Sequence, residues 1–314
     1  MRGPVQGAEE AVADRNSGSL TAFFNTGARL EHGALIYEGQ TIGMRRLMEE
    51  SRRIAAAFER LGIGHGDRVA IWLPSCPAWL SAFFACAQLG AIAVAINTRY
   101  RSAELEDILA RSGAKLLLFW PGYRHLDFVD ILEGLSERAV AGLHAIVEYD
   151  EEATPLRFES IHGRPVHAWR TLLASGPLEG DRAVEQDGVI MFTTSGTTRA
   201  PKFVLHSHAS IRTHVADIGP AFGFDGPDGC NLLVPPLCGV FGFCMALSSL
   251  AAARPLVVLH TFHAAEAAAL IRRHQVTHMA AVGDVVAQLL AASDEPRPYP
   301  SLRAVIGVRA GQAA

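Results

Sequence analysis

Three consecutive segments of the chain share one pattern, in which a helical stretch ends near a glycine and leads into a short run of Val, Ile, Leu or Ala. The helical stretches and the apolar runs that follow them are 44–63 and 67–74, 78–89 and 91–96, and 102–112 and 115–120. Helices that alternate with apolar strands are typical of domains in which helices cover a largely parallel sheet. The pattern therefore predicts an α/β fold with layered parallel-sheet subdomains.

The third helical stretch carries a start signal. Ser102 lies three residues before the apolar Leu105, and acidic residues from Glu104 to Asp107 lie near the first turn. A hydroxyl at the start and negative charge at the positive end of the helix dipole both favour a helix. We therefore predict that this helix begins at Ser102.

The rest of the chain continues the pattern less regularly. Further apolar runs that are suited to strands lie at 143–149, 189–192, 231–234, 255–260 and 277–282. Between about Tyr123 and Glu185, proline, glycine and charged residues are scattered, which indicates a connecting region over the surface. We predict a first α/β subdomain over residues 1–185, including this region, and a second over residues 186–314.

The run from Trp79 to Ile96 is long and apolar enough to raise the question of a membrane span. Gln88 and Gly90 interrupt it, and β-branched residues gather only after the glycine. This order indicates a buried helix, a glycine stop and a short buried strand. We predict no integral membrane segment.

Composition limits the partners and the compartment. Of the 314 residues, 49% are hydrophobic and 19% are charged, and the formal net charge is -4. These values argue against disorder and against a basic surface that attracts nucleic acid. The five cysteines form no CxxC pair, and the first residues are polar and unlike a secretory signal. Both features predict reduced thiols in the cytoplasm.

The stretch TTSGTTRAPK, residues 193–202, follows the strand predicted at 189–192. It therefore places hydroxyl groups at the carboxyl edge of a sheet, where open α/β sheets bind ligands. Hydroxyl and backbone N–H groups can surround polyphosphate oxygens, Gly196 permits close approach, and Lys202 adds a positive charge. The spacing is not that of a Walker A loop. From composition alone, a polar surface turn rich in Ser and Thr is an equally open alternative.

Thirteen histidines raise the question of a metal site. His274 and His278 are four residues apart, as in zinc proteases, but Gln275 stands where that chemistry requires glutamate. Val276 and Thr277 favour the start of a strand, which would place the two histidines on a strand and remove the helical spacing. We therefore predict no metal ligands.

The segment MFTTSGTTRAPK, residues 191–202, resembles the phosphate-binding signature of the AMP-forming acyl-adenylating enzymes, which include acyl-CoA synthetases, adenylation domains of peptide synthetases and firefly luciferase. Other segments resemble the same family in the correct order, and they are residues 66–109 with GDRVAI, LGA and NTRY, LHSH at 205–208, PPLCGVFGF at 235–243, and 276–290. The resemblance covers most of residues 20–314 and concerns the N-terminal part of the family's chain.

The resemblance implies a reaction in which a carboxylate attacks the α-phosphate of ATP and gives an acyl adenylate and pyrophosphate. A thiol of coenzyme A, or of the phosphopantetheine on an acyl carrier protein, would then displace AMP. The acid is expected to be fatty or aromatic, and Mg²⁺ would accompany ATP. The implied phosphate-binding residues are Thr194, Ser195, Gly196, Thr197, Thr198 and Lys202. The implied acyl-pocket residues are Cys238, Gly239, Val240, Phe241 and Gly242. No catalytic residue is assigned.

Four positions depart from the family's pattern. Arg199 stands where glycine or serine is usual, and Phe203 stands where a glycine follows the lysine. If position 199 requires positive φ, arginine costs about 1 to 2 kcal/mol there. Arg199 either adds a guanidinium to the phosphate site or weakens ATP binding by propping the loop open. Cys238 and Gly239 replace an aromatic residue and a histidine, which predicts either an enlarged or reshaped pocket or a relaxed gate on the thiol tunnel. Cys238 itself is interpreted as a small buried thiol in preference to a nucleophile.

The chain ends at Ala314, before the region where the family carries an acidic magnesium ligand, a ribose-binding aspartate and a C-terminal lid domain with a catalytic lysine. We therefore expect an incomplete adenylating enzyme whose second subdomain is unfinished and whose lid domain is absent. Alone it should bind nucleotide weakly and turn over slowly or not at all. The alternative is a non-catalytic nucleotide- or acyl-binding protein derived from this family.

Overall fold

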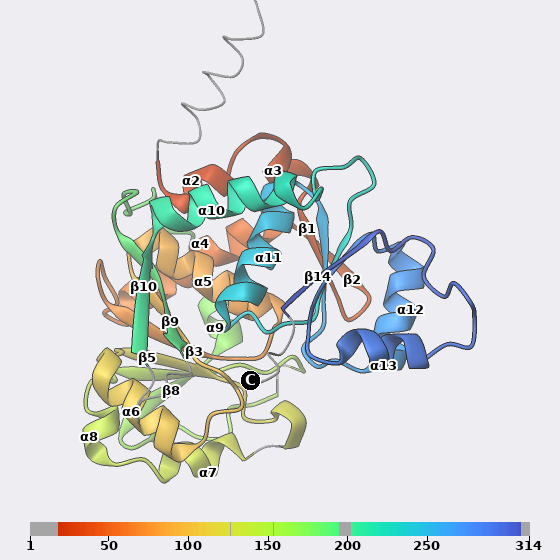
Figure 1. Cartoon of the computed structure of the whole chain (residues 1–314). Helices are drawn as coiled ribbons and strands as arrows, with labels where there is room; N and C mark the ends of the chain where they lie inside the picture. The colour runs from red at the N-terminus through yellow and green to blue at the C-terminus, as the bar shows by residue number, and fades with distance from the viewer. Residues whose placement is uncertain (1–17, 126, 153, 195–201, 309–314) are drawn as a thin grey trace, which may run out of the picture.

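A computed structural model describes residues 18–125, 127–152, 154–194 and 202–308, which form two sheets covered by helices (Figure 1). The first sheet has the strand order β10-β9-β4-β3-β5-β6-β8-β7, and the second has the order β14-β13-β11-β12-β1-β2. The first sheet consists of β3 (Arg68–Trp72), β4 (Ile92–Ala95), β5 (Leu116–Phe119), β6 (Ala145–Glu148), β7 (Ser160–Ile161), β8 (Arg164–Ala168), β9 (Gly188–Thr194) and β10 (Lys202–Ser207). The second consists of β1 (Ala34–Tyr37), β2 (Gln40–Gly43), β11 (Asn231–Leu233), β12 (Pro255–Val258), β13 (His278–Val282) and β14 (Ala304–Val308).

The α/β fold with parallel sheets is confirmed. Strands β3, β4, β5, β6, β8 and β9 pair in parallel in the first sheet, and an antiparallel hairpin adds β10 at its edge. The longer helices are α4 (Met44–Arg60), α5 (Pro77–Leu89), α6 (Ser102–Ser112), α10 (His208–Ala221), α11 (Val240–Ala251) and α12 (Ala264–His274). The shorter ones are α2 (Leu20–Phe24), α3 (Gly27–His32), α7 (Phe128–Glu133), α8 (Glu137–Val140), α9 (Trp169–Leu173) and α13 (Val285–Ala291), with a 3₁₀ turn at Tyr123–His125. All three predicted pairs of helix and strand form, as α4 with β3, α5 with β4, and α6 with β5.

Side chains alternate between the two faces of the first sheet, as the two-residue period of a strand requires. In β3, Val69 and Ile71 join the large hydrophobic cluster that contains α4 and α5. Ala70 and Trp72 join a second cluster, which contains α6, α7 and α8. Helices therefore cover both faces of the central strands of this sheet, which explains why β4 and β5 are apolar throughout.

The second sheet takes its strands from both ends of the chain. Strand β1 pairs in parallel with β12, so that Ala34 lies opposite Pro255, and β2 follows β1 in an antiparallel hairpin. Conversely, β9 and β10 follow residue 185 in the chain but complete the first sheet. Strands from both sides of residue 185 thus pair within each sheet. The division into subdomains 1–185 and 186–314 stays a prediction.

The interpretation of residues 123–185 as a surface connection is wrong in part. Strand β6 forms where a strand was predicted at 143–149, but β8 also extends the first sheet, and Phe128 of α7 is buried with its ring 4.3 Å from that of Trp72. The helices of this region have only four to six residues, which is too short for a clear periodic signal.

Helix α6 begins at Ser102, as predicted, but the Ser102 hydroxyl is not its cap. The residue before the helix is Arg101, and the Glu104 carboxylate accepts the Arg101 backbone N–H at 3.1 Å.

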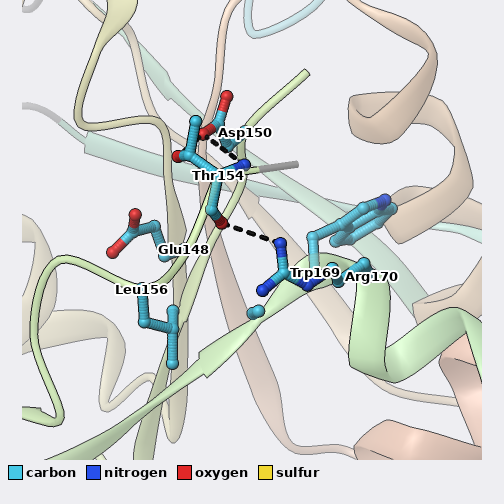
Figure 2. A pocket seen from close by; sticks show the side chains of 7 residues that line it. Glu148, Asp150, Thr154, Leu156, Trp169 and Arg170 are labelled. Atoms are coloured by element: carbon cyan, nitrogen blue, oxygen red, sulfur yellow. Dashed lines mark hydrogen bonds between the residues drawn. The ribbon is translucent and has the colours of Figure 1, made fainter. Parts of the chain in front are cut away.

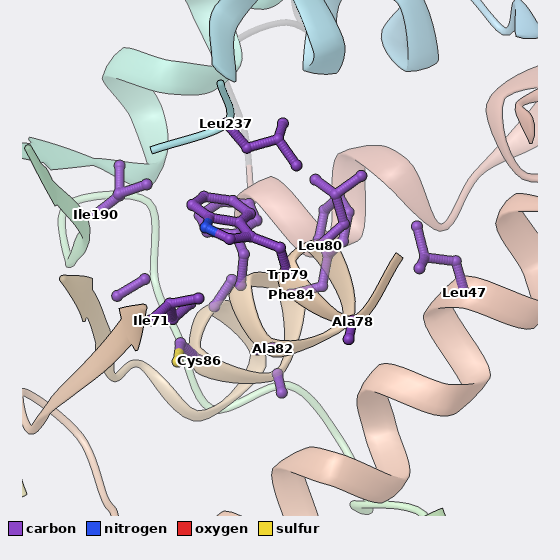
Figure 3. Close-up of a cluster of buried hydrophobic side chains, with 14 of the residues drawn as sticks. Leu47, Ile71, Ala78, Trp79, Leu80, Ala82, Phe84, Cys86, Ile190 and Leu237 are labelled. Carbon is purple, nitrogen blue, oxygen red and sulfur yellow. The ribbon is translucent and has the colours of Figure 1, made fainter. Parts of the chain in front are cut away.

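Helix α5 is buried on nearly all sides and forms the centre of the largest hydrophobic cluster (Figure 3). Trp79 of this helix lies among Ile71 and Ile190 of the first sheet and Leu237 of the segment before α11. Gly90 ends the helix with φ 68, and an added Cβ there would meet the His65 ring at 2.6 Å. The predicted buried helix, glycine stop and strand are confirmed. Among the described helices, none is both long and apolar enough to cross a bilayer.

The two sheets meet through a polar contact at their carboxyl ends. The Tyr37 hydroxyl, at the end of β1, donates to Glu151 Oε1 at 2.5 Å, and Glu151 follows β6. The Tyr123 hydroxyl donates to the carbonyl of His260, which follows β12, at 2.8 Å. Burial raises the pKa of Tyr37, so its hydroxyl keeps the proton that it donates. These bonds connect segments of both sheets.

A buried histidine connects the start of the described chain to α10. His208 is fully buried, and its Nδ1 accepts the Leu20 backbone N–H at 3.1 Å. Arg212, one turn later, donates to the Gly18 carbonyl at 2.6 Å. Burial lowers the pKa of His208 to about 4; the Arg212 cation acts in the same direction, and Asp181 and Asp187 oppose it. His208 is therefore neutral in the folded protein.

We expect this histidine to make stability depend on pH. Its pKa is about 4 when folded and 6.5 when unfolded, so the unfolded state binds more protons between these values, and stability falls as the pH falls through that window. Asparagine can present an oxygen near the place of Nδ1, so His208→Asn is the matched variant. The wild type should lose up to about 3 kcal/mol relative to His208→Asn between pH 6.5 and pH 4 in denaturant unfolding. Parallel pH curves for the two proteins would contradict this assignment.

Candidate functional site

The carboxyl edge of the first sheet gathers three loops that are distant in sequence. Strands β4 and β9 are parallel neighbours, with Ala93 opposite Ile190, so the residues after each strand leave the sheet at the same edge. The segment after β3 leaves there too, and Ser75 Oγ accepts the Leu237 backbone N–H at 3.0 Å. This bond brings the segment before α11 to the same edge. Open α/β sheets bind ligands in this position.

The first and last of the predicted phosphate-binding residues stand at this edge. Thr194 is the last residue of β9, and Lys202 is the first residue of β10 and lies directly opposite it in the antiparallel hairpin. Lys202 is exposed. Ser195, Gly196, Thr197 and Thr198 lie outside the described residues, and so does Arg199. The structure therefore brings the two ends of the hydroxyl-rich segment together, and the role of the whole set stays a prediction.

Tyr100, for which the sequence indicates no role, lies beside this hairpin and contacts Thr193 within it. The Tyr100 hydroxyl and Thr193 Oγ1 are 3.0 Å apart in a hydrogen bond. Tyr100 belongs to NTRY after β4, and Thr193 is the penultimate residue of β9. Tyr100 lies in NTRY and Thr193 in TTSGTTRAPK. The two residues can be predicted to meet only when β4 and β9 are known to be neighbours. That adjacency comes from tertiary structure and cannot be read from either motif.

Phe203, which departs from the family's pattern, has a defined partner. The Arg111 guanidinium of α6 lies 4.7 Å from the centre of the Phe203 ring, which is within the range of a cation–π contact. Arg111 also pairs with Asp107 at 2.6 Å. Phe203 itself packs against the cluster around Trp72. An aromatic ring at this position thus fixes β10 against α6, which a glycine could not do.

The predicted acyl-pocket residues form the entry to α11. Cys238 is half-buried, Gly239 precedes the helix, and Val240 and Phe241 are partly exposed in its first turn. Gly242 packs so closely that an added Cβ would lie 2.3 Å from the Pro236 carbonyl oxygen. At Gly239 the nearest atom would be 3.5 Å away, so a side chain would fit there. The structure brings these five residues together, and their contact with an acid stays a prediction.

Cys238 has the properties of an inert thiol. Burial raises the pKa of Cys238 to about 12, although the Arg99 guanidinium and the Thr98 backbone N–H act in the opposite direction. A thiol with this pKa is almost wholly protonated at neutral pH, and the thiolate is the nucleophile. This favours the interpretation of Cys238 as a packing residue.

A small hollow at the end of β6 is separate from these residues (Figure 2). Thr154 donates its backbone N–H to Asp150 Oδ2 at 3.2 Å, and Arg170 donates to the Thr154 carbonyl at 2.8 Å. The hollow leaves about 10 Å³, which is roughly the room for one water molecule. The Glu148 side chain lines it, and burial raises the pKa of this carboxyl. The hollow is too small for a nucleotide or an acyl chain.

The histidine pair HQVTH does not form a helical metal site. His274 is the last residue of α12 and His278 is the first residue of β13, while Gln275 between them has φ 49. The prediction that both histidines lie on a strand is therefore wrong for His274. In the part of the chain that the structure describes, no three His, Cys, Asp or Glu side chains are grouped to hold a metal ion.

Parallel α/β layers of this kind define a class of proteins that bind ligands at the carboxyl ends of their strands, and comparison with known proteins identifies the family within that class. Residues 25–314 match the AMP-binding enzyme family, and the chain belongs to this family. A methyl-dioxo-octahydroindenyl-propanoyl:CoA ligase of Mycobacterium tuberculosis is 32% identical over 79% of this chain and 47% of its own length. A 4-coumarate–CoA ligase 5 of Oryza sativa subsp. japonica is 28% identical over 85% of this chain and 47% of its own.

Solved structures agree in fold. The N-terminal domain of FACL13 from Mycobacterium tuberculosis superposes with a TM-score of 0.74 and 24% identity, over 92% of this chain and 69% of that one. The chain spans less than half the length of the curated relatives named above. The predicted resemblance to the acyl-adenylating enzymes is confirmed.

The inert state of Cys238 leads to a chemical prediction. At pH 8, iodoacetamide should alkylate Cys238 in the folded protein at least about a hundredfold more slowly than in the chain unfolded in guanidinium, because so little thiolate is present. Trypsin leaves Cys230, Cys238 and Cys244 on one peptide, so tandem mass spectrometry must fragment that peptide to locate the label on Cys238. Rapid, selective labelling of Cys238 in the folded protein would show an activated thiol and would contradict the assignment.

Proposed function

We propose that this chain carries the nucleotide- and acid-binding part of an AMP-forming acid–thiol ligase. The observation that carries the proposal is the pairing of Thr194 with Lys202 at the carboxyl edge of the sheet, in a chain of the AMP-binding enzyme family. The start of α11 lies at the same edge through the bond between Leu237 and Ser75. A phosphate-binding hairpin and an acid-binding segment thus converge where the strands of the first sheet end.

In the proposed reaction, a carboxylate oxygen attacks the α-phosphorus of ATP, the bond to the β-phosphate oxygen breaks, and pyrophosphate leaves. The Lys202 ammonium would neutralise charge on the phosphates, as a point charge beside loop N–H and hydroxyl donors. Positioning and charge neutralisation are the main contributions that a protein makes to such transfers. A thiol sulfur would then attack the acyl carbonyl, and AMP would leave.

Magnesium is expected to arrive with ATP. It usually keeps several waters and is held by substrate phosphates with one or two protein oxygens. Bound Mg²⁺ would offset the charge of the phosphates.

The acid is proposed to be fatty or aromatic. Val240 and Phe241 give the entry of α11 an apolar, partly exposed surface, and Gly239 leaves room that a side chain would otherwise fill. Coenzyme A is the proposed acceptor, because curated relatives are named as CoA ligases. A carrier-protein phosphopantetheine and a cytoplasmic location remain predictions from the sequence.

The chain offers a matched control for the phosphate-binding cation, because it has only two lysines, Lys115 and Lys202. Lys115 pairs with Asp67 at 2.8 Å, at the opposite end of the sheet. We expect Lys202→Met to weaken MgATP binding by about tenfold to a hundredfold, the value of one hydrogen bond to a charged group. Lys115→Met should bind as the wild type does. Titration calorimetry measures both variants.

A second measurement separates binding from chemistry. Exchange of labelled pyrophosphate into ATP is followed in the presence of a panel of fatty and aromatic acids. Exchange that depends on an acid supports the ligase. This chain alone is already expected to turn over slowly or not at all, so the non-catalytic binding protein is favoured only if an extended version with a lid domain also binds MgATP tightly and gives no exchange with any acid. If the folded chain shows no MgATP binding at millimolar nucleotide, the proposed function is wrong.

A further inference from the structure

Two contacts from one segment hold both strands of the β9–β10 hairpin next to its predicted phosphate-binding end. Tyr100 bonds to Thr193 of β9 at 3.0 Å, and Arg111 lies against the ring of Phe203 of β10 at 4.7 Å. Tyr100 precedes α6 and Arg111 lies in its last turn. Tyr100 and Phe203 both pack on the hydrophobic cluster around Trp72. A single helix and its leading turn thus support the hairpin from the side.

The turn that carries Tyr100 is itself fixed by hydrogen bonds. The Asn97 carbonyl accepts the indole N–H of Trp72 at 3.2 Å and the backbone N–H of Tyr100 at 3.0 Å. Asn97 Oδ1 accepts the Arg99 N–H at 2.9 Å. Trp72 is fully buried, so this turn has a rigid anchor in the core. A hydroxyl held in this way can determine the position of its partner.

The register of the hairpin relates these contacts to Lys202. Thr193 lies opposite Phe203, and the next pair along the hairpin is Thr194 opposite Lys202. Adjacent residues of a strand point to opposite faces, so Lys202 takes the face opposite Phe203 and does not contact Tyr100 through its side chain. Any effect of Tyr100 on Lys202 must pass through Thr193 and the backbone of the hairpin.

We propose that Tyr100 is a positioning residue for nucleotide binding, which acts through Thr193 to hold the Thr194–Lys202 end of the hairpin. The contact between Phe203 and Arg111 supports the other strand. The expected effect of Tyr100 on ATP binding rests on the proposed function. The mechanical link between Tyr100 and the hairpin is independent of that function. It also gives Phe203 a role, since glycine there would leave β10 without its contact to α6.

The test begins with Tyr100→Phe, which removes one hydroxyl and keeps the ring. We expect its dissociation constant for MgATP to rise about fivefold in titration calorimetry, the effect of losing one hydrogen bond. Thr193→Val should give a similar rise and Thr193→Ser should bind as the wild type does. The double variant Tyr100→Phe/Thr193→Val should be no weaker than Thr193→Val alone, because the two residues share one bond.

The matched control is Tyr299→Phe, which removes a hydroxyl that donates to the Leu289 carbonyl at 2.7 Å, in the hydrophobic cluster of the second sheet. It should bind MgATP as the wild type does, even where its thermal midpoint falls as much as that of Tyr100→Phe. Equal ATP affinity for Tyr100→Phe and the wild type would overturn the proposal, as would additive losses in the double variant.

A readout without nucleotide separates this proposal from the proposed function. Amide hydrogen exchange of the β9–β10 pairs near Thr193 should be faster in Tyr100→Phe than in the wild type and in Tyr299→Phe. If the wild type binds no MgATP, the proposed function fails, and exchange then decides whether Tyr100 holds the hairpin. Unchanged exchange in Tyr100→Phe would overturn the mechanical link.

Discussion

The parallel pairing of β4 with β9 is the constraint on which the site depends. Only two residue pairs, Ala93 with Ile190 and Val94 with Met191, define their register, yet they bring together segments from distant parts of the chain. Because both strands run in the same direction, the turn at Asn97 and the end of β9 leave at one edge. The hydrogen bond between Tyr100 and Thr193 is possible only as a result of this adjacency.

Hydrophobic packing around α5 keeps that pairing in place. The rings of Phe83 and Phe243 lie 4.9 Å apart, edge to face, and Phe192 of β9 lies 5.4 Å from Phe243. Each fully buried ring of this size stabilises the fold by roughly 1.5 to 3 kcal/mol. The same side chains therefore connect α5, α11 and the strand that leads into the hydroxyl-rich segment. Stability and site geometry share one set of contacts.

Much of the fold could be predicted from local sequence, because glycine stops and apolar runs mark α4 to β5 clearly. The parallel fold, the buried α5 and the end of α5 at Gly90 follow from such local signals. Strand β1 could not be placed, since its partner β12 comes late in the chain and pairing between them is a tertiary fact. The short helices after Tyr123 and the hairpin strand β10 also lack a periodic signal of useful length.

For the site, the chemistry of Lys202 and the hydroxyl side chains could be predicted from residue type. The contacts of Tyr100 and Arg111 with the hairpin could not be predicted in this way. Nothing in the sequence around Tyr100 or Thr193 indicates that the two residues contact each other until the order of strands is known. Phe203 was noticed only as a departure, because the guanidinium that explains it lies on a helix earlier in the chain. Residue types indicate chemistry, whereas neighbours across a sheet must come from the fold.

The pairing of β1 with β12 has a consequence for synthesis on the ribosome. Strand β1 leaves the exit tunnel long before β12 is synthesised, because its residue Ala34 pairs with Pro255. Closing so long a loop is slow compared with forming local contacts such as the β1–β2 hairpin, and the edge of β1 that later pairs with β12 is exposed to wrong partners in the meantime. All strands of the first sheet, β3 to β10, are translated before β11. This sheet can therefore assemble earlier and bury the apolar faces of α4 and α5. The nascent chain would thus form the β9–β10 hairpin before its second sheet closes.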